Sequence, residues 1–298
     1  MIGIFPALIF KADFRGVHLG ERRNMRITYY GTAASEAWPA LFCRCRACEM
    51  ARIYKGKNIR TRSQALIDRS VLIDFPPDTN YHAQYLGLEL AAVRTLLITH
   101  SHHDHFFPYD ICMRNPKYAQ RLEEESLHMY GNEVIGERFK KASAICGDTK
   151  KYVTFHLLAP FETVYTTDGY TVTALPADHN PPEKALMYMI EKAGKRLLYA
   201  HDTGIFPEST WAYIKNIRFD LISLDCTALS RDWRRGHMGF EAADEVRDRL
   251  ENLGCADKET VFVLSHLAHF GDFTHDKICE IEEPKGYTVA YDGYFRDI

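Results

Sequence analysis

The segment that most constrains this chain is His-Ser-His-His-Asp-His, at positions 100–105. It directly follows residues 95–99, an apolar and β-branched run that predicts a short buried strand. Imidazole and carboxylate groups are good ligands for divalent transition metals such as zinc or manganese. The segment holds five such groups, and the four at the H-x-H-x-D-H spacing are too many for one small structural site. They fit two metal ions in one cleft, with His100 and His102 (the first pair) on one ion and Asp104 and His105 (the second pair) on the other.

This pattern after a strand resembles the metallo-β-lactamase superfamily, in which an H-x-H-x-D-H motif is followed by further ligands on later strands. The resemblance implies an α/β (α+β) fold, an αββα sandwich, with the metals at one edge of the sheets. The sequence supplies the implied ligands in order, since His179, Asp202 and His266 each come shortly after an apolar run. By this resemblance, His179 joins the first pair, His266 joins the second pair, and Asp202 bridges the two metals.

The residue at the bridging position indicates which branch of the superfamily this chain resembles. The true β-lactamases carry a cysteine there, whereas this chain has Asp202 followed by Thr203 and Gly204. This context resembles the phosphodiesterase and tRNA 3′-processing branches. We therefore do not expect β-lactamase activity.

A second group of metal-type residues lies upstream. Cys43, Cys45 and Cys48 form a C-x-C-x2-C turn in which three thiolates are close enough to reach one ion. Thiolates favour zinc, and a tetrahedral Cys3His site needs one histidine from elsewhere, for which His269, three residues after His266, is the candidate. The phosphodiesterase of the carbon–phosphorus lyase pathway, which this chain resembles most, carries such a cluster completed by a histidine of an H-x-x-H pair. We expect one structural zinc here, with reduced bystander thiols or a redox pair as the alternatives.

The resemblance also implies how the chemistry proceeds. Two metals, zinc or manganese, hold a bridging hydroxide that attacks phosphorus, and the departing alkoxide needs a proton. We expect Asp104, as a ligand, and His237, as the proton donor, to take part in catalysis, because an imidazole pKa of about 6.5 suits proton delivery near neutral pH. The alternative for His237 is a loop histidine that caps the following helix. Arg231, Arg234 and Arg235 beside it are candidates to bind a second phosphate, although surface arginines often have no ligand.

The expected substrate is a small cyclic phosphodiester such as 5-phosphoribosyl 1,2-cyclic phosphate, which the carbon–phosphorus lyase enzyme opens. The first alternative is a tRNA 3′-processing nuclease, but the sequence shows no Gly- and Lys-rich arm and its formal net charge is −3. A thioester hydrolase of the glyoxalase II type uses nearly the same ligands, and a non-catalytic accessory protein can share the fold. The cysteine cluster argues against the thioester hydrolase, and the intact ligand set argues against the accessory protein.

Length and composition fit one domain. Hydrophobic residues make up 46% of the 298 positions, which is enough for a large core. We expect the hydrolase domain at residues 25–298, and residues 1–24 are either an extra strand and loop or a segment before the true initiator, Met25. Eight cysteines are not a dense disulfide framework, so we expect the other thiols to be reduced and the location to be cytoplasmic. We expect no nucleic-acid partner and no membrane association, and homodimers are one option.

Other segments alternate between strand and helix patterns. Residues 64–67 and 71–73 predict a hairpin that ends at Asp74, which is either a hydrogen-bond partner of a metal-ligating histidine or an exposed turn carboxylate. Residues 108–147 are polar and predict a helical insert, either a lid over the site or a surface helix. Residues 240–253 predict an amphipathic helix.

Overall fold

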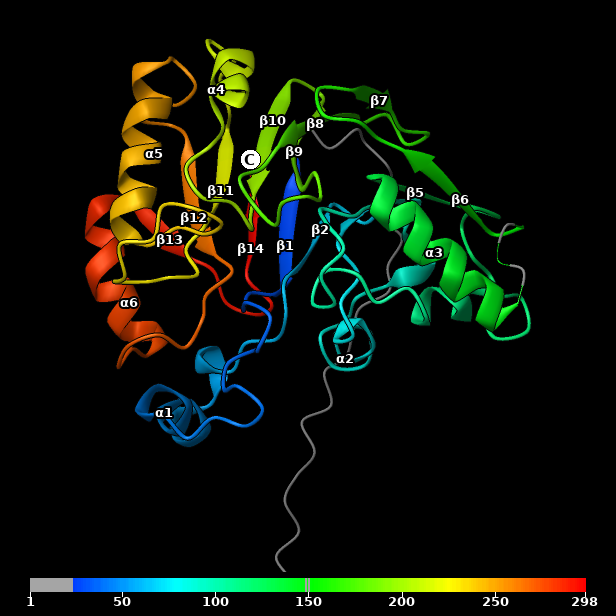
Figure 1. The fold of residues 1–298 in the computed structure, drawn as a ribbon, viewed down its shortest axis with the longest axis horizontal. Helices are drawn as coiled ribbons and strands as arrows, with labels where there is room; N and C mark the ends of the chain where they lie inside the picture. Colours follow the sequence, from blue (N-terminus) through cyan, green and yellow to red (C-terminus); the bar gives the residue numbers. More distant parts are fainter. Residues whose placement is uncertain (1–23, 148, 150) are drawn as a thin grey trace, which may run out of the picture.

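The computed structural model describes residues 24–147, 149 and 151–298, and its core is a pair of seven-stranded sheets (Figure 1). The predicted extension of residues 1–24 lies outside the described residues, apart from Asn24. The strands of the first sheet are β1 (Arg26–Gly31), β2 (Gln64–Ile67), β3 (Val71–Ile73), β4 (Thr95–Leu97), β5 (Leu127–Gly131), β6 (Val153–Leu157) and β14 (Phe295–Asp297). Those of the second sheet are β7 (Thr163–Tyr165), β8 (Thr171–Pro176), β9 (Leu186–Lys192), β10 (Lys195–Ala200), β11 (Leu221–Asp225), β12 (Val261–Ser265) and β13 (Tyr287–Val289). The spatial orders are β14-β1-β2-β3-β4-β5-β6 and β13-β12-β11-β10-β9-β8-β7.

The two sheets share one buried core. Ile27 and Tyr29 of β1 belong to the same cluster of buried side chains as Tyr188 of β9. The tyrosine hydroxyls in this core have partners: Tyr29 donates to Ser223 Oγ at 2.8 Å, and Tyr188 donates to the carbonyl oxygen of Ile98 at 2.6 Å. Because a buried hydroxyl without a partner is costly, these bonds fix how the two sheets lie on each other.

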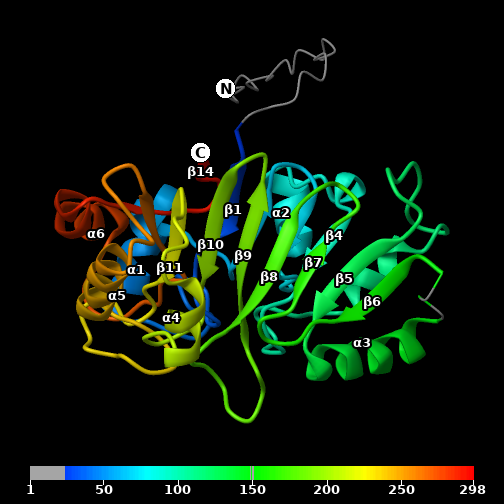
Figure 2. The ribbon, with the colours of Figure 1, turned by 90° about the horizontal axis from the view of Figure 1, so that it is seen from above.

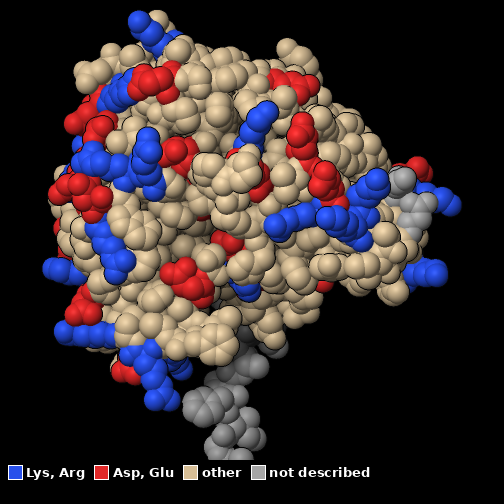
Figure 3. Space-filling view, in the orientation of Figure 1, with Lys and Arg blue, Asp and Glu red and all other residues tan. Residues whose placement is uncertain are grey.

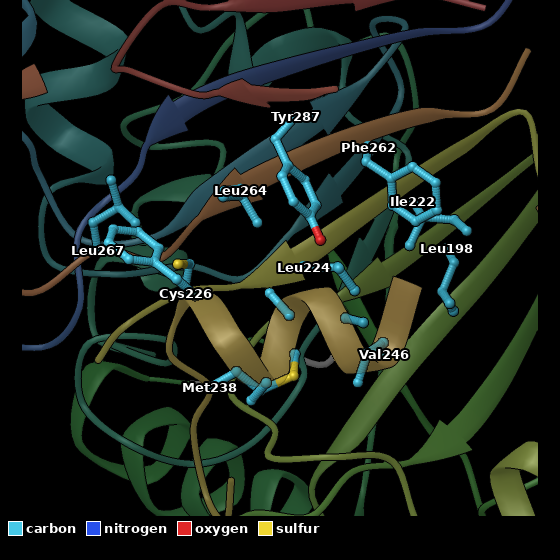
Figure 4. Close-up of a cluster of buried hydrophobic side chains, with 14 of the residues drawn as sticks. Leu198, Ile222, Leu224, Cys226, Met238, Val246, Phe262, Leu264, Leu267 and Tyr287 are labelled. Atoms are coloured by element: carbon cyan, nitrogen blue, oxygen red, sulfur yellow. The ribbon is translucent and has the colours of Figure 1, made fainter. Parts of the chain in front are cut away.

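Helices cover the outer face of each sheet. The helices are α1 (Arg46–Tyr54), α2 (Thr79–Tyr85), α3 (Glu133–Cys146), α4 (Glu208–Ile214), α5 (Phe240–Asn252) and α6 (His275–Glu282), with short 3-10 turns η1 (Gly56–Asn58), η2 (Leu90–Ala92), η3 (Asp110–Arg114) and η4 (Glu283–Lys285). Helix α3 lies on the first sheet beside β5 and β6, and α5 and α6 lie on the second (Figures 1 and 2). Figure 4 shows Val246 of α5 among the apolar side chains of the second sheet, such as Leu198 and Leu224. The layers are therefore those of the expected αββα sandwich.

Strands from both sheets end at one edge of the sandwich. Strands β10, β11 and β12 are parallel, and β8 runs in their direction because it and β10 both lie antiparallel to β9. The end of β4 reaches the same edge, since Thr99 accepts a backbone hydrogen bond from Leu186 at 2.9 Å. The loops that follow these strands are the ones in which the sequence predicts metal ligands.

The element predictions are largely confirmed. The hairpin is β2 and β3, and the amphipathic helix is α5. The prediction of a helical insert over residues 108–147 is wrong, because η3, strand β5 and helix α3 share this segment. Strand β5 has no β-branched residue, so its pattern did not stand out from the polar residues around it, yet it pairs with both β4 and β6. Helix α3 packs on the outer face of the first sheet through Ile135 and Phe139 and is a layer helix rather than a lid.

Two further findings bear on earlier expectations. All eight cysteines lie within the described residues, and none of them forms a disulfide. Among the helices in the described part of the chain, none has the length and apolar character needed to span a membrane.

Candidate metal centre

The first pair of histidines meets a third histidine at the edge of the sandwich. Nε2 of His100 lies 2.9 Å from Nδ1 of His102, and Nε2 of His179 lies 3.3 Å from the same atom of His102. Nδ1 of His179 donates to the carbonyl oxygen of Gly236 at 2.8 Å, which leaves Nε2 of His179 free to bind an ion. The structure therefore brings together the three residues expected on the first metal.

The second pair meets His266 in the same way. Nε2 of His105 lies 3.2 Å from Oδ2 of Asp104 and 3.2 Å from Nε2 of His266. All three side chains are buried. The ligand-type atoms of this group lie within 4.8 Å of one another, a spacing that one metal ion can span.

The Asp202 carboxylate lies between the two groups. Its Oδ2 atom is 2.5 Å from Nε2 of His105 and 3.0 Å from Nε2 of His266. Its Oδ1 atom is 3.7 Å from Nε2 of His179. One oxygen thus faces each group, which is the arrangement that a bridging ligand requires.

The chemistry of these donors fits divalent metals. Oδ1 of Asp104 is buried and accepts no hydrogen bond from any described residue, and the buried Oδ2 of Asp202 faces the imidazole nitrogens of His105 and His266. Burial of a carboxylate without compensation is costly, and a bound cation provides that compensation. Burial lowers the pKa of His266, but the charge and hydrogen bond of Asp202 outweigh it and raise this pKa to about 10. The negative charge of these carboxylates beside the histidines favours a bound cation at this point.

Three residues around this edge adopt a backbone conformation that non-glycine residues rarely show. Asp74 after β3, Asp202 after β10 and His266 after β12 have φ angles of 64°, 50° and 59°. Each such residue costs about 1–3 kcal/mol, and strain of this kind clusters at functional sites. Three of the twelve such residues in the described part of the chain lie at this edge, and two of them are candidate metal ligands.

Hydrogen bonds behind the cluster orient its histidines. Asp74 Oδ2 lies 2.7 Å from Nδ1 of His105, so the contact predicted between Asp74 and a histidine of the motif is confirmed. Nδ1 of His266 lies 2.7 Å from Oγ1 of Thr227. Both contacts leave Nε2 of the histidine directed into the cluster.

Asp225, at the end of β11, was missed by the sequence analysis. It is fully buried, accepts backbone hydrogen bonds from Asp202 and Met238, and lies 3.1 Å from Nδ1 of His237. These donors occupy its oxygens, so it positions neighbours rather than facing the ion site. The available signal was its place at the end of a buried strand, like Asp202.

His237 itself lies beside the cluster. Its Nδ1 atom is 3.4 Å from Oδ1 of Asp202, and its side chain is 23% exposed. Burial lowers the pKa of His237, but the nearby Asp225 carboxylate outweighs it, so the net shift is upward. Within the described residues, Nε2 of His237 has no hydrogen-bond partner.

Glu183, in the loop after β8, was also missed. Its carboxylate accepts hydrogen bonds from Ser101 Oγ at 2.7 Å and from Asn132 Nδ2 at 2.8 Å. It therefore joins the loop of His179 to the loop of the first pair. Nothing in the local sequence marks this role, because the three partners are far apart along the chain.

The cysteine cluster forms as expected. Nδ1 of His269 lies 3.3 Å from Sγ of Cys45 and 3.7 Å from Sγ of Cys43, and Cys48 belongs to the same group of ligand-type atoms. Nε2 of His269 lies 3.4 Å from Oε1 of Glu36, which orients the ring. Four thiol and imidazole ligands at this spacing fit a tetrahedral zinc.

Comparison with known families identifies the chain. Residues 69–266 match the family described as a beta-lactamase superfamily domain. The chain belongs to this superfamily. The match covers most of the sandwich, including the H-x-H-x-D-H motif and His266, and the family and its fold are those of metal-dependent hydrolases.

Solved structures show where the superfamily fold recurs. A diphosphatase of the PhnP family has 20% identity and a TM-score of 0.72, covering 92% of this chain and 97% of that chain. Zinc-bound PqqB from Methylobacterium extorquens has 19% identity and a TM-score of 0.72, covering 92% and 100%. The short form of human tRNase Z has 14% identity and a TM-score of 0.64, covering 91% and 98%. At these identities the likeness shows the superfamily fold, and a search of curated proteins gave no match.

The other residues named from the sequence near the centre are placed as follows. His103 is exposed and His201 is buried between Ser63 and Ser223, so neither faces the ion site. Arg234 forms ion pairs with acidic neighbours. Arg231 and Arg235 are exposed and have no acidic partner among the described residues.

Proposed function

We propose that this chain is a metal-dependent phosphodiesterase that hydrolyses a small cyclic phosphodiester such as 5-phosphoribosyl 1,2-cyclic phosphate. The observation that carries the proposal is the position of His237 beside Asp202, with Nδ1 against Asp225 and Nε2 without a partner among the described residues. An alkoxide is a poor leaving group and needs a proton as the P–O bond breaks, whereas a thiolate leaves without one. A held imidazole at this point therefore favours a phosphodiester over a thioester.

In the proposed enzyme the ligands fall into two sets, one for each metal ion. His100, His102 and His179 would hold one divalent ion, zinc or manganese, and Asp104, His105 and His266 would hold the other, with Asp202 shared between them. When bound, such ions supply Lewis acidity toward the phosphate and a water of lowered pKa. The chain's own groups orient the ligands through Asp74 and Thr227 and bring a proton to the leaving oxygen at Nε2 of His237.

We also propose that Cys43, Cys45, Cys48 and His269 bind one structural zinc. His269 is three residues from His266, so one short loop would carry a ligand of each metal site. The first turn of that loop is fixed by backbone bonds, since Leu267 donates to Thr32 at 2.9 Å and accepts from Ala34 at 3.1 Å. A zinc here would hold the loop of His266 in place.

A small substrate is consistent with the charge distribution on one face of the molecule. On the face shown in Figure 3, basic and acidic side chains intermingle and no patch of one sign covers the surface. A nucleic-acid partner normally requires a basic stripe or patch. We therefore propose a small diester rather than an RNA as the substrate, and a cytoplasmic location stays a prediction.

The test is hydrolysis of bis(p-nitrophenyl) phosphate by the full chain after removal of metals with EDTA and reloading with zinc or manganese. Turnover that requires metal and is lost in Asp202→Ala supports the proposed function. Metal content is measured for each protein, so that loss of an ion is separated from loss of folding. Absence of turnover in wild-type protein that carries two ions at the cluster would refute the phosphodiesterase proposal.

A further inference from the structure

The loop that carries His237 also carries two arginines with no acidic partner among the described residues, Arg231 and Arg235, and of these two Arg231 stacks on aromatic rings. Arg231 is exposed, and no described carboxylate lies within ion-pair distance of its guanidinium. Arg234, on the same loop, differs because it pairs with Asp232 and Glu245. Two arginines three positions apart are thus in opposite states, one neutralised and one with its charge uncompensated.

Aromatic rings hold the Arg231 side chain in place. Its guanidinium carbon lies 3.9 Å from the ring centre of Phe270 and 5.9 Å from that of Trp233. The Trp233 and Phe270 rings meet edge to face, with 5.3 Å between their centres. Stacking on a ring uses the flat face of a guanidinium and leaves the N–H groups at its edge free to donate.

This cluster of Arg231, Trp233 and Phe270 borders the proposed active site. The Trp233 ring centre lies 6.4 Å from that of His237, the proposed proton donor. On the other side, Phe270 follows His269 of the cysteine cluster, and the two ring centres are 6.0 Å apart. The free cation therefore stands at the margin of the metal centre and not at an unrelated surface.

The backbone of the loop is braced. Arg231 donates to Ala228 O at 3.0 Å, and Trp233 donates to Arg231 O at 2.7 Å. A Cβ atom at Gly239 would lie 2.0 Å from the carbonyl oxygen of Arg231, so the loop closes on itself at a point where only glycine fits. Arg231 is therefore presented from a fixed position, which lowers the entropy cost of binding a ligand.

We propose that Arg231 is a specificity-determining residue that binds a second phosphate, a monoester group of the substrate distant from the diester that is cleaved. The proposal deepens the phosphodiesterase function and rests on it. A guanidinium group can donate two parallel hydrogen bonds to a phosphate. No described carboxylate of the protein takes this place at Arg231. The ring centre of the exposed Trp233 lies 5.9 Å from the guanidinium carbon of Arg231 and 6.4 Å from the ring centre of His237.

The test uses two cyclic diesters that differ only in a distal phosphate. Steady-state kinetics of the metal-reloaded full chain are measured on uridine 2′,3′-cyclic phosphate and on its 5′-phosphorylated form. Wild type is expected to have the lower KM for the phosphorylated diester. Arg231→Gln is expected to raise that KM about tenfold or more and to leave the KM of the unphosphorylated diester unchanged.

Arg234→Gln is the matched control, because Arg234 lies on the same loop and already has acidic partners. It is expected to leave both KM values unchanged. Arg231→Lys keeps the charge but not the fork and is expected to recover part of the preference. If Arg231→Gln changes both diesters alike, or neither, the assignment of Arg231 is wrong.

A binding measurement keeps this test separate from the proposed function. Calorimetric titration with uridine 3′,5′-bisphosphate and with uridine 3′-phosphate requires no turnover. If neither diester is hydrolysed, the phosphodiesterase proposal fails, while weaker bisphosphate binding in Arg231→Gln than in wild type still supports the phosphate subsite. Equal affinity of the two proteins for the bisphosphate overturns the subsite.

Discussion

The Asp225 carboxylate lies 3.1 Å from Nδ1 of His237 and holds the imidazole beside the metal centre. The same carboxylate accepts the backbone N–H of Asp202 at 3.1 Å. One buried side chain at the end of β11 thus positions both the proposed bridging ligand and the proposed proton donor. Asp225 therefore connects the proposed proton donor to the proposed metal centre.

The first prediction concerns the leaving group. His237→Ala should lower kcat about a hundredfold or more on a cyclic ribose diester, whose leaving group is an alkoxide. The same change should have a much smaller effect on bis(p-nitrophenyl) phosphate, because p-nitrophenolate leaves without a proton. Steady-state kinetics on both substrates provide the measurement. Equal losses on the two substrates would show that His237 does not donate the proton.

The second prediction concerns the loop contacts of Glu183. Glu183→Ala removes the acceptor shared by Ser101 and Asn132 and should weaken metal binding at the first group about 10- to 100-fold. Competition with a chromophoric chelator measures the affinity. Glu125→Ala, at an exposed glutamate away from these loops, is the control. Unchanged affinity in Glu183→Ala would mean that these hydrogen bonds do not support the ligands.

The third prediction concerns the cysteine cluster. Cys45→Ser should reduce the zinc content by one ion per chain and lower the melting temperature by several °C, since each kcal/mol lost shifts it by about 2–4 °C in a chain of this size. Cys146→Ser, at an exposed thiol outside the cluster, should change neither. Elemental analysis and thermal unfolding test both proteins. Full zinc content in Cys45→Ser would contradict the structural site.

The fourth prediction concerns stability at low pH. Burial and the charges of Arg60 and Lys57 lower the pKa of His275 to about 4, and its Nδ1 accepts a hydrogen bond from Arg60 at 2.9 Å. The unfolded histidine, with a pKa of about 6.5, takes up its proton first as the pH falls. The stabilisation is therefore complete above pH 7 and is lost progressively as the pH falls toward 4.

Between pH 7 and pH 5, the free energy of unfolding of wild type should fall by about 2 kcal/mol more than that of His275→Asn, which keeps an acceptor for Arg60 but does not titrate. Urea unfolding of both proteins at the two pH values, with the same metal content, measures this difference. Parallel losses in the two proteins would show that His275 does not remain neutral in the fold.

The candidate ligands could be named from the sequence because the resemblance to the superfamily gives their order and each stands just after a buried apolar run. His179, Asp202 and His266 follow strands whose patterns are clear, and the H-x-H-x-D-H motif marks the edge at which they meet. In the folded chain these residues lie close together, although they are far apart in the sequence. The αββα layers were expected from the resemblance to the superfamily, and the strand and helix patterns agree with them.

The supporting residues could not be found in this way. Asp225 ends a strand but belongs to no motif, and Glu183 joins the two loops through partners 82 and 51 residues away. Strand β5 was hidden because its residues are not typical of a strand, although its place between two parallel neighbours imposes that form. Such roles depend on contacts between residues that are distant in the sequence, and a local sequence pattern does not reveal these contacts.

We propose above all that this chain cleaves a cyclic phosphodiester with the aid of metals held around Asp202. Phosphorus NMR of 5-phosphoribosyl 1,2-cyclic phosphate, incubated with metal-reloaded wild type and with Asp202→Ala, is the decisive experiment. The ribose 1,5-bisphosphate should accumulate with wild type, and the cyclic diester should stay intact with Asp202→Ala. An intact cyclic diester with wild-type protein shown to carry two ions at the cluster would refute the proposed function.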